Sequence, residues 1–160
     1  MTHDLVIRNA QLRKKRGRFD IGIQGGVIKA IAPKIREKGK RVIDAGGSLV
    51  TESFVNTHLH LCKVYTLQMM DNKALTSYHG ENMGAAMTAI ELAARVKDKY
   101  NETWIIKNVR KALMSAARNG NTHIRAFADV DSKAKLIGLK ALLKARDELK
   151  GIVDVQVVAF

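Results

Sequence analysis

The sequence predicts an α/β protein in which a β-rich segment precedes a parallel sheet with helical crossovers. Three observations support this fold class. Short apolar runs joined by glycines fill the first fifty residues, long stretches with apolar residues at helical spacing follow residue 54, and the strands between those stretches are apolar. Because a strand, a helical crossover and a second strand form a parallel pair, this order predicts right-handed crossovers.

The β-rich segment covers residues 1–53 and consists of short strands separated by turns. The paired glycines Gly25 and Gly26 favour a tight hairpin, since both turn positions can adopt positive φ. The expected strands are Leu5–Ile7, Phe19–Ile23, Val27–Ile31, Arg41–Asp44 and Ser48–Val50.

Residues 54–160 alternate strands with helices. Gly120 and Gly151 follow periodic apolar stretches and are expected to end helices, and Ser132 is expected to cap the last helix. The expected strands are Phe54–Leu61, Thr122–Phe127 and Ile152–Phe160, and the expected helices cover 85–100, 102–118 and the stretch from Ser132 to Leu149.

Three parallel strands with outer helices do not close a barrel. The last strand ends in the apolar run Val157–Phe160. Since an exposed apolar strand edge favours association, we expect a companion chain, a second copy of this chain or the rest of a longer protein to cover the open edge.

Composition excludes several classes of protein. Lys and Arg number 28 against 15 Asp and Glu, which gives a net charge of +13. The single cysteine, Cys62, excludes an internal disulfide, and the first thirty residues lack the apolar stretch of a secretory signal. No apolar run approaches the about 20 residues that span a bilayer. A cytoplasmic protein without a membrane segment is expected.

Two histidines, His58 and His60, lie at positions i and i+2 of an expected strand. Their side chains therefore point to the same face and can reach one cation, while Leu59 packs on the other side. Imidazole suits a transition metal such as zinc or iron. Two ordinary histidines at a strand end are the alternative. The metal site is favoured because (β/α)₈ barrels carry their active sites where strands end.

Several segments resemble the start of amidohydrolase superfamily enzymes in order and spacing. Two later segments resemble the branch that contains cytosine deaminase and N-isopropylammelide isopropylamidohydrolase. The resemblance implies the amino-terminal part of a (β/α)₈ TIM barrel, about three strand/helix units over 54–160, preceded by part of a composite β-sandwich over 1–53. The superfamily segments are Asp4–Ala10, Asp20–Ile31, Ile43–Gly47 and Phe54–Leu61, and the branch segments are Asn121–Asp131 and Ile152–Phe160.

This resemblance makes His58 and His60 ligands of one divalent transition metal, zinc or iron. In the family, the other ligands and the proton-transfer histidine come from later strands. We therefore expect no catalytic residue within this chain and weak metal binding by it alone. The implied reaction is metal-assisted hydrolysis of a C–N bond in a cyclic amidine or amide, and the implied substrate is a small nitrogen heterocycle.

The resemblance also implies substrate-binding roles for Arg125 and His123. A structural pairing of Arg125 with Asp129 or Asp131 is the alternative. Two departures from the family pattern lie near the predicted ligands. Phe127 stands where many relatives have histidine, and Cys62 stands where an aspartate commonly follows. They leave metal binding intact and widen the range of substrates.

Two non-enzymatic hypotheses remain: the chain is a catalytically inactive remnant, or it is a basic module that binds RNA or an acidic partner. The run Arg13–Arg18 motivates the second. Only Phe19 adjoins this run to stack on bases, and a charged loop is expected between two strands. A nucleic-acid partner is therefore not favoured.

Overall fold

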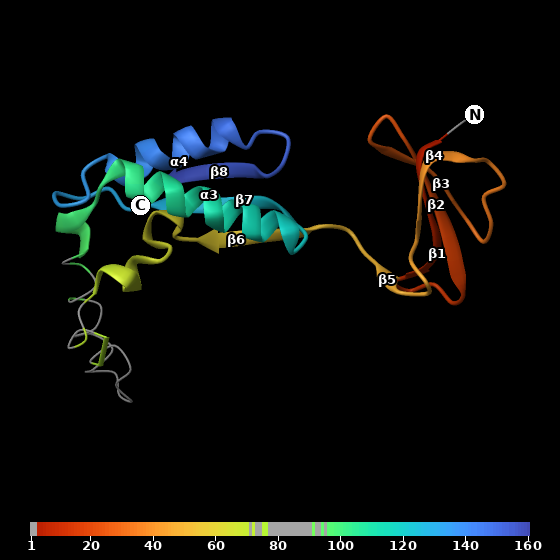
Figure 1. Ribbon diagram of the computed structural model, residues 1–160, viewed down its shortest axis with the longest axis horizontal. Coiled ribbons are helices and arrows are strands. Elements are labelled where there is room, and N and C mark those ends of the chain that lie inside the picture. The colour runs from red at the N-terminus through yellow and green to blue at the C-terminus, as the bar shows by residue number, and fades with distance from the viewer. Residues whose placement is uncertain (1–2, 71, 73–74, 77–90, 92–93, 95) are drawn as a thin grey trace. The chain divides into compact units, whose positions relative to one another are not determined.

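The computed structural model describes residues 3–70, 72, 75–76, 91, 94 and 96–160. The chain divides into two compact units, Met1–Glu52 and Ser53–Phe160, and the elements of each are labelled in Figure 1. Most of the helix expected at 85–100 lies outside the described residues. Within the described part of the chain, no helix is both long and apolar enough to cross a membrane.

The first unit is an open sheet in the order β3-β2-β1-β4, with β5 also paired to β1. The pairs β1–β2 and β2–β3 are antiparallel, whereas β4 and β5 run parallel to β1. Gly25 and Gly26 form the expected tight turn, with φ angles of 59° and 74°. The strands are β1 (His3–Leu12), β2 (Arg18–Gln24), β3 (Val27–Ala32), β4 (Gly39–Asp44) and β5 (Leu49–Val50).

The buried carboxylate of Asp20 joins three segments of this unit. Asp20 is 5% exposed and accepts hydrogen bonds from the Arg8 guanidinium and from the backbone N–H groups of Asn9 and Ile35. Burial raises the pKa of Asp20, but these hydrogen bonds lower it by more, so the net pKa lies below its ordinary value of 3.8. Asp20 therefore ties β1 and β2 to the segment after β3.

The second unit contains the predicted parallel sheet, in the order β6-β7-β8. Helices α3 and α4 share one hydrophobic core with the sheet and cover the same face of it (Figure 1). The strands are β6 (Phe54–Leu59), β7 (Asn121–Ala128) and β8 (Asp154–Ala159), the helices are α3 (Glu102–Arg118) and α4 (Ile137–Glu148), and the 3₁₀ turns are η1 (Leu61–Lys63), η2 (Thr66–Met69) and η3 (Val96–Lys99).

Helix α3 has the bounds that its apolar spacing predicts. Asn101 caps it, since its side chain accepts a hydrogen bond from the backbone N–H of Trp104. Gly120, with a φ of 82°, follows its end. Apolar spacing and Gly120 located this helix from the sequence alone, whereas the Asn101 cap was not anticipated.

The expectation that Ser132 caps α4 is wrong. The helix begins at Ile137, and its N-cap residue, Leu136, makes no side-chain hydrogen bond. The Asp131 carboxylate instead accepts hydrogen bonds from the backbone N–H groups of Lys133 and Ala134. This acceptor holds residues 132–136 in turns and delays the start of the helix.

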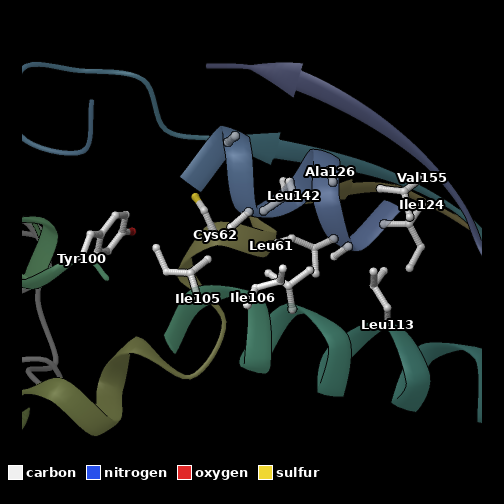
Figure 2. Packing of buried hydrophobic residues seen from close by; sticks show 14 of the residues in the cluster. Leu61, Cys62, Tyr100, Ile105, Ile106, Leu113, Ile124, Ala126, Leu142 and Val155 are labelled. Carbon is white, nitrogen blue, oxygen red and sulfur yellow. The ribbon is translucent and has the colours of Figure 1, made fainter. Parts of the chain in front are cut away.

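The core of the second unit lies between the sheet and the two helices. Figure 2 shows Ile105, Ile106 and Leu113 extending from α3 toward Leu61 and Leu142. Leu61 is fully buried in this cluster. Because Leu61 directly follows His60, the core fixes the chain where β6 ends.

We expect Asp20→Ala to destabilise the first unit. The substitution leaves the Arg8 guanidinium and two backbone N–H groups without their acceptor, which costs about 2–3 kcal/mol. Native-state hydrogen exchange read on β1 and β2 peptides of the full chain measures this loss. The Asp4 side chain is 43% exposed, pairs with Lys40 and accepts one hydrogen bond, from the backbone N–H of Gly25, so Asp4→Ala should cost only about 1 kcal/mol. Equal effects of the two substitutions would contradict the role of Asp20.

The same carboxylate predicts a pH dependence. Because the pKa of Asp20 is lower in the folded state than its ordinary 3.8, its stabilising effect is complete above 3.8 and is lost as the pH falls through the folded-state pKa. Hydrogen-exchange protection of β1 and β2 should fall over that acidic range. In Asp20→Asn, which does not titrate, this fall should shrink, and an unchanged fall would exclude Asp20 as its source.

Candidate metal centre

His58 and His60 lie side by side at the carboxyl end of β6. Their ring centroids are 5.1 Å apart. Leu59, between them in sequence, packs against the hydrophobic core. The strand alternation predicted from His-x-His is therefore present, and both imidazoles lie on the sheet face away from the helices.

Two phenylalanines stand against these imidazoles. The Phe127 ring stacks on His58 at 4.4 Å and lies 5.6 Å from the His60 ring. Phe160 meets His60 edge-on at 5.0 Å. Phe127 thus forms an apolar wall beside the predicted ligands and contributes no ligand atom.

A buried carboxylate, Asp129, lies behind His60 where β7 ends. Its side chain is 3% exposed, and its Oδ1 is 3.4 Å from His60 Nδ1. Its Oδ2 lies 3.0 Å from Lys63 Nζ and 2.7 Å from Lys97 Nζ. The Sγ of Cys62 accepts a hydrogen bond from the Asp129 backbone N–H at 3.3 Å. Asp129 thus joins the ends of β6 and β7 to η3.

The charges around Asp129 favour its ionised form. Burial raises its pKa, but the ammonium groups of Lys97 and Lys63 lower it by more, so the net pKa lies below the ordinary value. Burial and then Lys63 lower the pKa of His60, more than the contact with Asp129 raises it. His60 is therefore neutral near pH 7, which is the form that binds a metal.

Arg125 and His123, the predicted substrate-binding residues, lie nearer the start of β7. Arg125 Nε donates a hydrogen bond to Gln156 Oε1 at 2.8 Å, and His123 Nε2 is 3.5 Å from an Asp154 carboxylate oxygen. Both residues line a pocket on the sheet face away from the helices. The structure brings His58 and His60 together, and it does not bring His123 to them.

The alternative pairing of Arg125 with an aspartate is absent from the ion pairs of the described residues. Lysines contact Asp129 and Asp131 instead. Arg125 is exposed, whereas Asp129 is buried just after the end of β7.

The two imidazoles fit the beginning of a transition-metal site and do not complete one. Within the described ranges, no group of three His, Cys, Asp or Glu side chains could hold a metal ion. Cys62 is 1% exposed and turned toward the Asp129 backbone. The donor set supplied by this chain is therefore a pair of imidazoles.

Sequence reasoning missed the association of Asp129 with His60. A signal for it was present, because Asp129 directly follows β7 as His60 directly follows β6. The carboxyl ends of neighbouring parallel strands meet at one edge of a sheet. Lys97 carried no comparable signal, since η3 is brought to the edge by tertiary packing.

Comparison with known proteins identifies relatives of this chain. No protein-family model matches it. N-isopropylammelide isopropyl amidohydrolase of Pseudomonas sp. (strain ADP) is 36% identical over 157 residues, which is 98% of this chain and 38% of that protein.

Solved structures also match. 5-Methylcytosine deaminase from Klebsiella pneumoniae, liganded with 5-fluorocytosine, has a TM-score of 0.75 and 26% identity, over 97% of this chain and 36% of that one. Atrazine chlorohydrolase TrzN from Arthrobacter aurescens TC1, complexed with zinc, has a TM-score of 0.68 and 17% identity, over 97% of this chain and 35% of that one. The second match shows a shared fold alone.

These matches confirm the predicted fold class, here with both sheets open. The chain spans 38% of the length of its curated relative and corresponds to the amino-terminal part of these proteins.

We expect Gly138→Ala to disturb the turn that follows His60. A Cβ at position 138 would lie 2.9 Å from the Cys62 Cβ, which cannot rotate away. Overpacking of about 1–3 kcal/mol should exceed the gain of about 1 kcal/mol in helix propensity. Urea unfolding followed by Trp104 fluorescence measures the net loss.

Lys140→Ala, at an exposed position of the same helix, is the control and should change stability by less than about 0.5 kcal/mol. A Gly138→Ala chain as stable as the unsubstituted protein would show that η1 yields to α4 at little cost.

Proposed function

Because this chain matches the amino-terminal part of amidohydrolase superfamily enzymes in sequence and in fold, we propose that it is the first part of a metal-dependent hydrolase that acts on C–N bonds. In this proposal, residues 1–53 contribute to a composite β-sandwich and residues 54–160 begin the catalytic barrel. His58 and His60 supply the first two metal ligands.

The observation that supports this proposal most directly is the position of the histidine pair. Both imidazoles lie at the carboxyl end of the first strand of a parallel sheet, the edge where barrel enzymes of this architecture hold their active sites. Their side chains lie on the face opposite the helices, which corresponds to the interior of a closed barrel.

The residues of this chain near the proposed metal ion fall into ligands and apolar neighbours. His58 and His60 would hold it through imidazole nitrogens, and Phe127 and Phe160 would exclude water from one side of it. When bound, a zinc or iron ion supplies Lewis-acid activation of water for hydrolysis. We name zinc first, because imidazole is among its usual ligands in catalytic sites.

The remaining groups of the site would come from outside the described residues. Catalytic zinc sites use about three protein ligands and a water molecule, and this chain contributes two of the protein ligands. We propose that further barrel strands, on the same polypeptide, on a companion chain or on a second copy of this chain, supply the others and cover the open sheet edge.

The proposed substrate is a small, planar nitrogen heterocycle that bears an amine or amide. Two relatives are named for such compounds, an ammelide derivative and 5-methylcytosine. Arg125 is proposed to donate hydrogen bonds to the substrate, since it lies two residues before Phe127, on the same face of β7. His123 lies two residues further from the metal ligands along β7 and is proposed only as a more distant substrate contact.

The test is native mass spectrometry with metal analysis on the protein purified from its own source cells. A species that contains about one transition metal, together with the missing strands, supports the proposal. That species should release ammonia or an amine from a panel of aminated triazines and pyrimidines. A metal-free, unaccompanied chain would overturn the proposal in favour of an inactive remnant, and salt-sensitive RNA binding by that chain would favour the basic module.

We expect His58→Ala and His60→Ala each to weaken zinc binding by the full chain at least about tenfold, because loss of a direct ligand should cost no less than loss of a residue that orients one. Competition with a chromophoric chelator measures the affinity. His123→Ala removes a histidine from the same sheet and is the matched control, with no expected change. Equal losses in all three variants would indicate nonspecific binding by surface imidazoles.

A further inference from the structure

The carboxylate of Asp129 is nearly inaccessible and incompletely satisfied. Its side chain is 3% exposed, and among the described residues neither of its oxygens has a partner in full hydrogen-bond geometry. The two lysine ammonium groups lie at ion-pair distance from Oδ2. Oδ1 therefore keeps a free acceptor site that faces His60.

His60 likewise has a buried ring nitrogen without a hydrogen-bond partner among the described residues. This nitrogen, Nδ1, lies 3.4 Å from Asp129 Oδ1. A buried polar group without a partner destabilises the folded chain. A small rotation of the imidazole would satisfy both atoms at once.

We propose that Asp129 is a positioning residue that accepts the Nδ1 proton of His60 and thereby presents Nε2 of that imidazole to a metal ion. The inference rests on the proposed metal-binding function and extends it to a residue outside the ligand set. Histidine ligands usually donate their second ring N–H to a carboxylate or carbonyl, which fixes the tautomer and the ring orientation.

The lysines make this arrangement possible. A lone buried carboxylate would favour protonation, and a protonated Asp129 would be a poorer acceptor. Lys63 Nζ and Lys97 Nζ lie 3.0 Å and 2.7 Å from the same oxygen, Oδ2. They stabilise the charge on Asp129 from one side and leave Oδ1 to the imidazole.

The backbone around Asp129 also fixes its position. Its N–H donates to the buried Cys62 Sγ, and the next residue, Val130, donates its N–H to the carbonyl oxygen of Phe160. The carboxylate is therefore held between the ends of β6 and β8. A residue held in this way can orient a neighbour with little motion of its own.

The inference is tested on the full chain with two readouts. The first is the tautomer of His60 without metal at neutral pH, read from the ring ¹⁵N shifts in long-range ¹H–¹⁵N spectra. We expect the Nδ1–H form in the unsubstituted protein and a shift toward Nε2–H in Asp129→Ala. The second is zinc affinity, which should fall about 10- to 100-fold in Asp129→Ala.

Three further variants separate positioning from a structural role. Asp129→Asn keeps an acceptor oxygen and should retain most of the zinc affinity. Lys97→Met removes an ion-pair partner of Asp129 without touching His60, and its loss should be smaller than that of Asp129→Ala. Asp154→Ala removes the carboxylate beside His123. His123 and Asp154 form a comparable histidine–aspartate pair on the same sheet, so this substitution should change neither the His60 tautomer nor zinc binding.

The outcomes distinguish this inference from the proposed function. A folded Asp129→Ala chain with an unchanged His60 tautomer and zinc affinity overturns the inference, as does an equal loss in Lys97→Met. If the unsubstituted chain binds no zinc, the metal-binding proposal fails, and the tautomer measurement alone still supports or overturns the pairing of Asp129 with His60.

Discussion

The alternation of side chains along three parallel strands is the constraint on which the candidate metal centre depends. Ile124, Ala126 and Ala128 of β7 are buried beneath the helices, so the residues between them must point to the other face. The same rule sends Leu59 toward the core and leaves His58 and His60 opposite. A slip of one residue in the pairing of β6 would exchange these faces and bury the imidazoles.

The helices enforce this register through the turn after β6. Leu61 and Cys62 are both buried, and α4 approaches so closely that glycine is required at position 138. Packing on the helical side thus determines where the chain leaves the sheet. The position of His60 on the opposite face of the sheet follows, because His60 and Leu61 are joined directly by a peptide bond.

Two of the chain's many lysines, Lys63 and Lys97, stabilise a buried carboxylate at this centre. Placing a cation site near two lysines is unfavourable unless a carboxylate lies between them. Asp129 contacts both lysines and faces the imidazole of His60. In the first unit, Asp20 has a similar relation to Arg8. In both units a buried carboxylate joins segments that are distant in sequence, with a basic side chain as its partner.

Local signals accounted for much of the fold. Paired glycines located the hairpin of β2 and β3, and apolar spacing with Gly120 located α3, because turns and helix ends depend on neighbouring residues. Spacing also placed His58 and His60 on one face. The start of α4 was misjudged, since Asp131 and Ser132 are adjacent acceptors and only the folded chain shows which one takes the backbone N–H groups.

The sequence by itself determined the strands, the crossovers and the histidine pair, since these follow from periods of two and 3.6 residues along the chain. Tertiary structure alone decided the contacts of that pair. Asp129 and Phe127 lie far from His60 in sequence and reach it only because β7 pairs with β6. Lys97 reaches Asp129 because η3 packs at the same edge. Contacts between distant segments depend on how complete elements pack, which no local pattern encodes.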